Sequence, residues 1–222
     1  MKVKLVSYSQ PSKEFLQEGI DDVQDLIAYA ARVSNPSNQL NSETSTRLLN
    51  YLAKHKHWSP FEMVSACLEI ETTRDIARQI LRHRSFSFQE FSQRYADPTK
   101  DLDFVIREAR LQDEKNRQNS IECDDEIIAN EWQIRQQHVI DTVKEHYDWA
   151  IRYGIAKEQA RAILPEGNTV SRMYMNGTLR SWIHYIELRA SNGTQKEHIE
   201  IAREVAKVIT EIFPLAEEYV NT

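Results

Sequence analysis

Residues 82–95 read RHRSFSFQEFSQRY, the most informative stretch of the chain. This stretch holds three arginines, one histidine and three serines, although the whole chain has a formal net charge of −6. The guanidinium group of arginine donates to phosphate oxygens two at a time, and serine hydroxyls can complete such a cradle. The stretch therefore predicts a binding site for a phosphorylated small molecule. A polar turn with solvated arginines at the end of a helix is the alternative.

The same residues are spaced as in a known motif. They resemble the pattern R-H-R-x-x-S-x-x-x-x-S-x-R of the flavin-dependent thymidylate synthases, and the matching residues are Arg82, His83, Arg84, Ser87, Ser92 and Arg94. Six fixed positions, three of them arginine, should rarely coincide by chance. The resemblance implies conversion of dUMP to dTMP, with FAD as hydride carrier, 5,10-methylenetetrahydrofolate as carbon donor and NADPH as reductant.

The length and composition are typical of a soluble globular protein. The 222 residues, 41% hydrophobic and 28% charged, predict a single domain over residues 1–222 with a substantial core. No apolar stretch approaches the roughly 18–20 residues that cross a bilayer, and residues 1–6 alternate like a strand. Cys67 and Cys123 are too few and too far apart to indicate a disulfide framework or a zinc cluster. We therefore expect a cytoplasmic protein with no membrane or metal partner.

The charge distribution favours a small anionic ligand over a nucleic acid. A general nucleic-acid binder is usually basic over the whole domain, whereas this chain is acidic. Arg74, Arg78 and Arg82 recur at helical spacing, which predicts a stripe of cations that leads into His83 and points at an anion. The alternative to an enzyme is a single-stranded nucleic-acid-binding module, in which these aromatic side chains would stack on bases: Phe86, Phe88, Phe91 and Tyr95.

Helical patterns dominate the rest of the chain. They predict helices over residues 23–31, 47–56, 126–153, 156–164, 178–190 and 197–212, with a further helix capped by Thr72 or Thr73. Strands are predicted over residues 1–6, 64–71, 104–106 and 169–175, and Gly193 suits a helix stop. Residues 108–126 carry no clear pattern. Because βαβ alternation and a glycine-rich phosphate turn are both lacking, we expect a helix-rich α+β fold with a small, mostly antiparallel sheet and a flavin site that is not of the Rossmann type.

A second resemblance lies in residues 57–62, which read HWSPFE. They are similar to H-x-S/T-x-x-E of the same family, which implies that Ser59 lies against the flavin and that His57 lies in the vicinity of the folate and NADPH. The histidine usual after the glutamate is Met63 here. On structural grounds alone the segment indicates a capped helix start. A metal site is the further alternative, formed by His55, His57 and Glu62.

A third resemblance concerns residues 160–165, ARAILP, which are similar to the family's A-R-x-x-L-P. It implies that Arg161 contacts the nucleotide, whereas a lone arginine here would otherwise indicate a cation at a helix end. Residues 194–198, TQKEH, also resemble one subgroup of the family.

A fourth resemblance covers residues 178–189, which are similar to the family's helix N-x-R-x-x-x-x-x-x-x-x-R. The place of the asparagine is taken by Thr178, with Asn176 two residues earlier, so the flavin contact from this position is open between the two. Arg180 and His184 share one helix face because they are four residues apart, and they are implied flavin contacts. Arg189 corresponds to the arginine that activates the uracil ring, and the alternative is a cation that caps its helix.

Together these segments imply a full set of site residues. The catalytic residue is Arg189. The implied dUMP contacts are Gln79, Arg82, Glu90, Phe91, Ser92, Gln93, Arg94, Arg161 and Arg189. The implied FAD contacts are Ser59, Arg82, His83, Arg84, Glu90, Thr178, Arg180 and His184. The resemblance also implies a homotetramer whose active sites are built from more than one subunit.

The two cysteines are consistent with a flavin route. Conventional thymidylate synthases attack the substrate with a cysteine thiolate, which needs a nearby cation or helix start. Cys67 lies in a predicted apolar strand and Cys123 in an acidic segment, so neither is expected to be an activated nucleophile.

Overall fold

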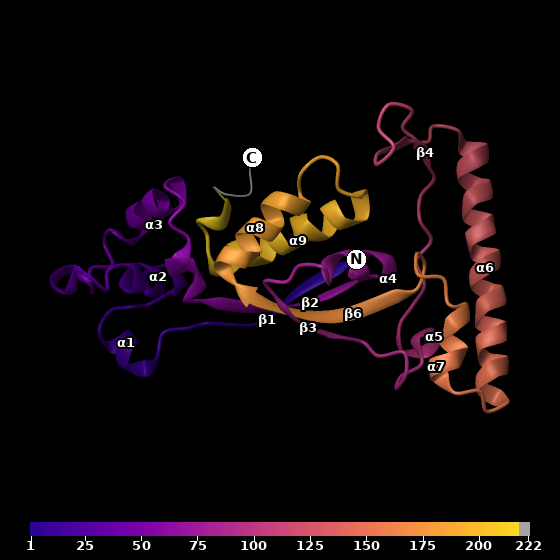
Figure 1. Cartoon of the computed structure of the whole chain (residues 1–222), viewed down its shortest axis with the longest axis horizontal. Helices are drawn as coiled ribbons and strands as arrows, with labels where there is room; N and C mark the ends of the chain where they lie inside the picture. The colour runs from indigo at the N-terminus through magenta and orange to yellow at the C-terminus, as the bar shows by residue number, and fades with distance from the viewer. Residues whose placement is uncertain (218–222) are drawn as a thin grey trace.

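A four-stranded sheet forms the centre of the protein (Figure 1). The computed structural model describes residues 1–217, and within them the strand order is β1–β2–β6–β3. Every pairing in this sheet is antiparallel, which confirms the predicted α+β class. The strands are β1 (Lys2–Tyr8), β2 (Ser65–Thr73), β3 (Ser87–Glu90) and β6 (Val170–Thr178).

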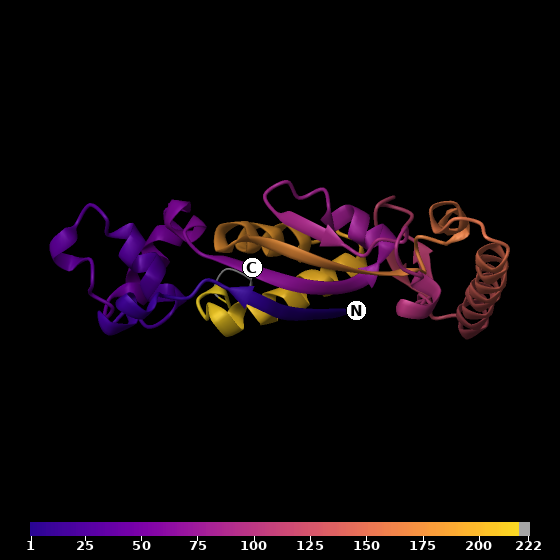
Figure 2. The same cartoon turned by 90° about the horizontal axis from the view of Figure 1, so that it is seen from below.

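The alternation of side chains along β2 decides which face of the sheet is buried. Ala66, Leu68 and Ile70 are at most 1% exposed and lie on one face, because side chains two residues apart point the same way. Two long helices, α8 (Leu179–Arg189) and α9 (Lys196–Ile212), cover the sheet (Figures 1 and 2). The buried indole of Trp182 donates from Nε1 to the carbonyl oxygen of Ala66 over 3.0 Å, so this core has its polar group satisfied.

Ion pairs run across the alternate positions of the same strands. Glu69 lies 3.5 Å from the ammonium group of Lys4 on β1, and Glu71 lies 2.7 Å from the guanidinium group of Arg172 on β6. The hydroxyl of Tyr174 donates to Glu69 over 3.0 Å. Cross-strand pairs of this kind stabilise the register modestly.

Three helices stand at one end of the sheet (Figure 1, indigo to violet). Asp22 caps the second of them, since its carboxylate accepts from the backbone N–H of Asp25 over 2.8 Å. Short 3-10 turns, Pro36–Asn38 and Ser59–Glu62, follow the second and third helices. The helices are α1 (Lys13–Gln17), α2 (Val23–Ala31) and α3 (Ser45–Lys54).

A long helix stands at the other end, next to a small second core (Figure 1). Asp125 caps it by accepting from the N–H groups of Ile127 and Ile128. The amide of Gln136 bonds both the N–H and the carbonyl of Arg107, which ties the helix to the preceding segment. The elements here are α5 (Pro98–Asp101), β4 (Arg110–Gln112), β5 (Ser120–Glu122), α6 (Glu126–Arg152), α7 (Lys157–Ala160) and a 3-10 turn, Arg161–Ile163.

Most predicted elements are confirmed, two details are wrong, and one stretch without a prediction is now described. Residues 104–106 are not a strand: Phe104 makes one bridge to Thr169, and the ladder stops because Gln136 takes both backbone groups of Arg107. Gly193 has a φ of +90°, but α8 already ends at Arg189, four residues earlier, so this glycine turns the connection instead of stopping the helix. The polar stretch 108–126 contains the hairpin of β4 and β5.

Among residues 1–217, no helix is both long enough and apolar enough to cross a membrane.

Gly177 of β6 gives a test of the packing behind the sheet. A Cβ atom at this position would lie 2.3 Å from Cδ1 of Phe86, far inside van der Waals contact. We expect Gly177→Ala to lower the free energy of unfolding in urea by about 1–3 kcal/mol, since a packed ring has to shift. Gly167→Ala is the matched control, because nothing lies within 4 Å of its added Cβ. Equal stabilities of the two variants would contradict this packing.

Candidate functional site

The arginine-rich stretch begins in the turn that closes α4 (Arg74–Ile80). The backbone N–H of His83 donates to the carbonyl of Ile80 over 3.0 Å, so the turn is tied to the helix end. The side chains of Arg82 and Arg84 are exposed, and neither forms an ion pair with any residue in 1–217. Two uncompensated guanidinium groups beside one another fit an anionic ligand such as a phosphate.

Phe86 anchors this turn to α8. Its ring centroid lies 4.7 Å from that of Trp182, and the hydroxyl of Ser181 donates to the carbonyl of Ser85 over 3.3 Å. Phe88 is also packed against the main core. These two rings belong to the protein interior and are not platforms for bases, so the structure does not favour the nucleic-acid alternative. Tyr95, in contrast, is 80% exposed.

Arg189, in the last turn of α8, reaches the same turn. Its Nε–H donates to Nε2 of His83 over 2.8 Å. Nε2 must therefore carry a lone pair, so His83 is neutral with its proton on Nδ1. Burial lowers the pKa of His83 to about 4, and the positive charges of Arg189 and Arg82 lower it further in the same direction. The predicted catalytic arginine and the predicted flavin-binding histidine thus form one unit.

A second histidine lies directly behind this unit, at the start of α9. His198 is fully buried, with Nε2 lying 3.0 Å from the hydroxyl of Tyr185 and Nδ1 lying 3.2 Å from Oε1 of Gln79. The amide nitrogen of Gln79 donates to Oε1 of Gln195 over 2.9 Å. Burial lowers the pKa of His198 to about 3, helped by the charge of Arg189 and by His83. Only Gln79 of this group was predicted as a site residue; the resemblance of residues 194–198 marked the segment without giving it a role.

The predicted flavin contacts on α8 lie beside the turn formed by residues 57–62. Arg180 pairs with Glu62 over 2.5 Å, and the ring of His184 stands edge-on to Trp58 at 4.9 Å. His57, Ser59 and Arg180 line a cavity of about 540 Å³, and Trp58 forms part of its wall. The structure therefore brings these predicted residues together. The hydroxyl of Thr178 accepts from the N–H of Ser181 over 3.3 Å and caps α8.

A second cluster of predicted residues lies at the far end of β3, against α7. Arg94 pairs with the carboxylate of Glu158 over 3.4 Å, and Nε of Arg161 donates to the carbonyl of the same residue over 3.3 Å. Next to Arg94 in sequence, Gln93 is 4% exposed and its amide nitrogen has no hydrogen-bond partner among the described residues. A buried donor without a partner is rare in folded proteins, so it marks a place where a ligand or a partner chain can bind.

The predicted stripe of cations on α4 is wrong in part. Arg74 is 6% exposed and lies 3.5 Å from Glu90, and Arg78 lies 3.7 Å from the same carboxylate. Both also lie within 4 Å of Glu166. Arg74 is therefore a buried partner of Glu90, whereas Arg78 is half-exposed beside Glu90 and Glu166. Arg82 is the cation of the stripe that has no carboxylate partner among residues 1–217. Glu90 also accepts from the hydroxyl of Ser171 over 2.8 Å, and its predicted contacts with dUMP and FAD stay predictions.

The predicted site residues thus form two groups within one chain. Arg82, His83 and Arg84 precede β3, whereas Ser92 and Arg94 follow it. The four residues of the strand alone span about 13 Å. The first group, with Arg189 and the turn at residues 57–62, lies on the α8 side, and the second, with Arg161, lies on the α7 side.

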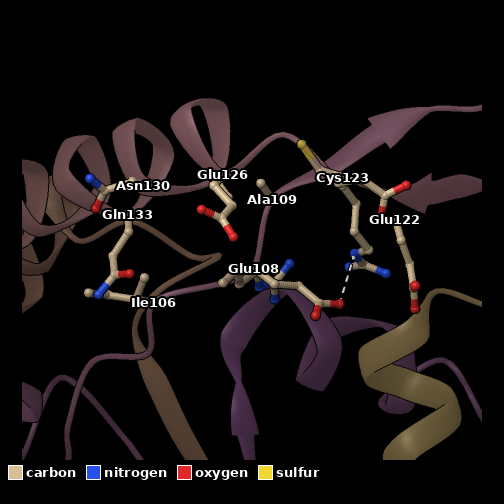
Figure 3. Close-up of a pocket in the computed structure, with 12 residues that line it drawn as sticks. Ile106, Glu108, Ala109, Glu122, Cys123, Glu126, Asn130 and Gln133 are labelled. Carbon is tan, nitrogen blue, oxygen red and sulfur yellow. Dashed lines mark ion pairs between the residues drawn. The ribbon is translucent and has the colours of Figure 1, made fainter.

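A cavity of about 760 Å³ belongs to neither group (Figure 3). It lies between α6 and the hairpin of β4 and β5, and Figure 3 shows carboxylates of Glu108, Glu122 and Glu126 around it. Arg107 and Arg110 also line it. Because Asp124 adds a fourth carboxylate, acidic groups outnumber basic ones, which is unfavourable for a phosphate ligand.

Cys67 and Cys123 are both free and half-buried. Burial raises the pKa of the Cys67 thiol, so this cysteine is less ionised than an ordinary one at neutral pH. The sulfur of Cys123 contacts the carbonyl of Asp125 at 3.7 Å. The environment of Cys67 therefore does not activate a thiolate.

Comparisons with known proteins agree on one family. The family described as "Thymidylate synthase complementing protein" (Thy1) matches residues 15–215. The chain is 49% identical over 214 residues, 96% of each chain, to a "Probable flavin-dependent thymidylate synthase" of Paramecium bursaria Chlorella virus 1. It is 47% identical, with the same coverage, to a "Flavin-dependent thymidylate synthase" of Synechocystis sp..

A solved structure shares the fold. The UMP/dUMP methylase PolB from Streptomyces cacaoi, bound with 5-Br dUMP, superposes with a TM-score of 0.79 at 23% sequence identity. The match covers 98% of this chain and 93% of that chain.

The two neutral histidines predict a loss of stability in mild acid. An unfolded histidine has a pKa near 6.5, whereas folding holds His198 at about 3 and His83 at about 4. As the pH falls from 7 to 5, the unfolded chain binds protons that the folded chain does not. We expect the free energy of unfolding in urea to fall by about 2 kcal/mol from His198 alone.

Two variants separate this effect from general acid sensitivity. His198→Asn cannot titrate, so its stability should change less between pH 7 and pH 5. His138→Asn removes an exposed histidine of α6 and should keep the full pH dependence. Identical pH dependence in both variants would contradict a neutral His198.

Proposed function

The chain belongs to the flavin-dependent thymidylate synthases, and on that premise we propose that it converts dUMP to dTMP by reductive methylation. FAD is the cofactor, with 5,10-methylenetetrahydrofolate as carbon donor and NADPH as reductant. The observation that carries the proposal is the Arg189–His83 unit, which lies next to the two uncompensated cations, Arg82 and Arg84. The described part of the chain would act as a single catalytic domain, and a cytoplasmic location stays a prediction.

The residues around the first group fit a flavin dinucleotide. Arg82 and Arg84 offer charge-assisted donors to its two phosphates, since neither is neutralised by a carboxylate among residues 1–217. The cavity lined by His57, Ser59 and Arg180 offers an aromatic wall and hydroxyl and guanidinium donors for a ring system. When bound, the flavin supplies the hydride for the methylation. On α8, His184 adds a ring beside Trp58.

The predicted flavin contact was left open between Thr178 and Asn176, and Asn176 is the better candidate. The Thr178 hydroxyl already caps α8 through Ser181, whereas the side chain of Asn176 is exposed on β6. A flavin contact from Asn176 would therefore require no rearrangement of the helix start.

The second group fits the phosphate of the nucleotide. Arg94 and Arg161 both contact Glu158, and the hydroxyl of Ser92 accepts from the N–H of Arg94 over 3.4 Å. The partnerless amide of Gln93 offers a further donor. Glu90 and Phe91 directly precede Ser92 in the sequence, whereas the remaining predicted dUMP contacts, Gln79, Arg82 and Arg189, lie with the first group.

The separation of the two groups supports shared active sites. Arg82 and Arg189 lie on the α8 side of β3, and Arg94 and Arg161 lie beyond its other end. A nucleotide whose base meets Arg189 and whose phosphate meets Arg94 can use the two groups from different subunits. We therefore propose a homotetramer in which one subunit supplies the first group and a neighbouring subunit supplies the second.

Arg189 would stabilise charge on the uracil ring. C5 of uracil becomes nucleophilic when electron density moves into the ring, and negative charge then develops on the carbonyl and N3 region. A fixed cation at that place lowers the barrier, often as the largest catalytic contribution. His83 holds Nε of Arg189 as an acceptor, which leaves the two terminal nitrogens of the guanidinium group for the ring. Arginine stays protonated, so it acts by charge and not as a base.

A spectrum and a product assay test this function. The purified protein should bind FAD with the absorbance of oxidised flavin, and it should form dTMP from dUMP only when methylenetetrahydrofolate and NADPH are both added. A colourless protein that takes up no added FAD and forms no dTMP would refute the proposal.

Arg189→Ala tests the catalytic assignment. We expect the variant to bind FAD and to be reduced by NADPH, yet to form dTMP more slowly by on the order of 10² or more. Stopped-flow flavin reduction, measured beside dTMP yield, separates the two steps. Arg152→Ala is the matched control, because it removes a cation from the last turn of another helix, α6. If Arg189 only capped its helix, both variants would lose stability and keep turnover.

A further inference from the structure

His198 bridges three helices from inside the core. It lies in the first turn of α9, and its two ring nitrogens contact Gln79 of α4 and Tyr185 of α8. The ring is fully buried, and Tyr185 is 1% exposed. A buried polar ring between two polar partners is fixed in orientation, because rotation would leave buried donors and acceptors unpaired.

The contacts define where each proton lies. The hydroxyl of Tyr185 is buried, and Nε2 of His198 is the acceptor that it contacts among residues 1–217, so Nε2 carries the lone pair. Nδ1 of His198 then carries the proton and donates it to Oε1 of Gln79. The amide nitrogen of Gln79 donates one of its two hydrogens to Gln195. A directed chain therefore runs from the Tyr185 hydroxyl through His198 and Gln79 to Gln195.

This chain settles the orientation of Gln79. If the amide were turned by half a rotation, its NH₂ group would face the Nδ1 proton of His198, and two donors would meet. His198 thus keeps the nitrogen of Gln79 away from the core. The second hydrogen of that nitrogen can then be donated to a ligand.

The ring of His198 also packs near the unit formed by His83 and Arg189. His83, which holds Arg189, stands edge-on to Tyr185 at 5.0 Å between ring centroids and to His198 at 6.5 Å. The side chains of Gln79 and Arg189 therefore lie on one continuous packed layer.

We propose that His198 is a positioning residue that orients the Gln79 amide so that its free N–H is donated to a carbonyl oxygen of the dUMP pyrimidine. The inference rests on the proposed function, because it assumes that Gln79 faces the nucleotide. His198 itself is fully buried and acts only through its neighbour.

Two substitutions of His198 each remove one of its two hydrogen bonds and keep the other. His198→Asn places an amide nitrogen at the position of Nδ1, so it can keep the bond to Gln79 and loses the one to Tyr185. His198→Gln reaches the position of Nε2, so it can keep the bond to Tyr185 and loses the one to Gln79. Both variants remain polar and each keeps one of the two bonds, so their melting temperatures should be similar.

The readout is dUMP affinity, measured by the change in flavin absorbance as dUMP is added to the FAD-loaded protein. We expect the Kd for dUMP to stay within about threefold of the unchanged protein in His198→Asn and to rise about tenfold or more in His198→Gln, which is about 1.4 kcal/mol. In steady-state assays the KM for dUMP should rise in His198→Gln by a larger factor than kcat falls.

A double substitution shows whether the effect passes through Gln79. Gln79→Leu combined with His198→Gln should bind dUMP no more weakly than Gln79→Leu alone, because the group to be oriented is already absent. Additive losses, or equal dUMP affinity in the Asn and Gln variants, would overturn the positioning role. If instead the unchanged protein binds FAD but neither binds dUMP nor forms dTMP, the proposed function itself fails.

Discussion

The pairing of β2 with β6 is the constraint on which the site depends. The strands are nine residues each, and Ser65 lies opposite Thr178 while Thr73 lies opposite Val170. Since α4 starts directly after β2 and α8 directly after β6, the two helices leave from opposite ends of a pair about 30 Å long. Their lengths of about 10 Å and 16 Å nearly span that distance. Their last turns therefore meet, and the meeting point is the 2.8 Å bond between Arg189 and His83.

The meeting of two helix ends explains the charges found there. Both C-terminal ends carry partial negative charge, which stabilises cations such as Arg82 and Arg189. A histidine between them could have been a third cation, but burial and the two arginines hold its pKa at about 4. The neutral ring of His83 can then accept from Arg189, which a protonated ring could not do. Neutrality of this histidine is thus what fixes the direction of the guanidinium group.

Local patterns in the sequence predicted most of the fold. Helical spacing predicted α2 and α6, and the alternation of residues 64–71 predicted β2. The strand β3 was missed although Phe86 and Phe88 alternate with polar residues, because the stretch was interpreted as a binding turn. The alternating pattern of a strand was present in the sequence, but the arginines and serines of the same stretch favoured the interpretation as a binding site.

The parts that could not be predicted depend on contacts between distant residues. The stripe of Arg74 and Arg78 has the same spacing whether it binds a ligand or pairs with Glu90 and Glu166, and only the fold decides between them. His198 is likewise an ordinary polar residue in the sequence, since its partner Gln79 is 119 residues away. Helical spacing shows which side chains share a face, but it does not show what that face meets.

The distribution of paired and unpaired arginines decides which anion the protein can attract. In a chain with a net charge of −6, most guanidinium groups near a carboxylate are neutralised, as Arg74 and Arg107 are by Glu90 and Asp75. Arg82 and Arg84 have no carboxylate partner among residues 1–217, because the turn that carries them is held by the ring of Phe86 and not by an ion pair. An aromatic contact holds this turn in place and leaves its two arginines unpaired with carboxylates. The turn can therefore be fixed in place and keep two unpaired guanidinium groups for a ligand that carries phosphate.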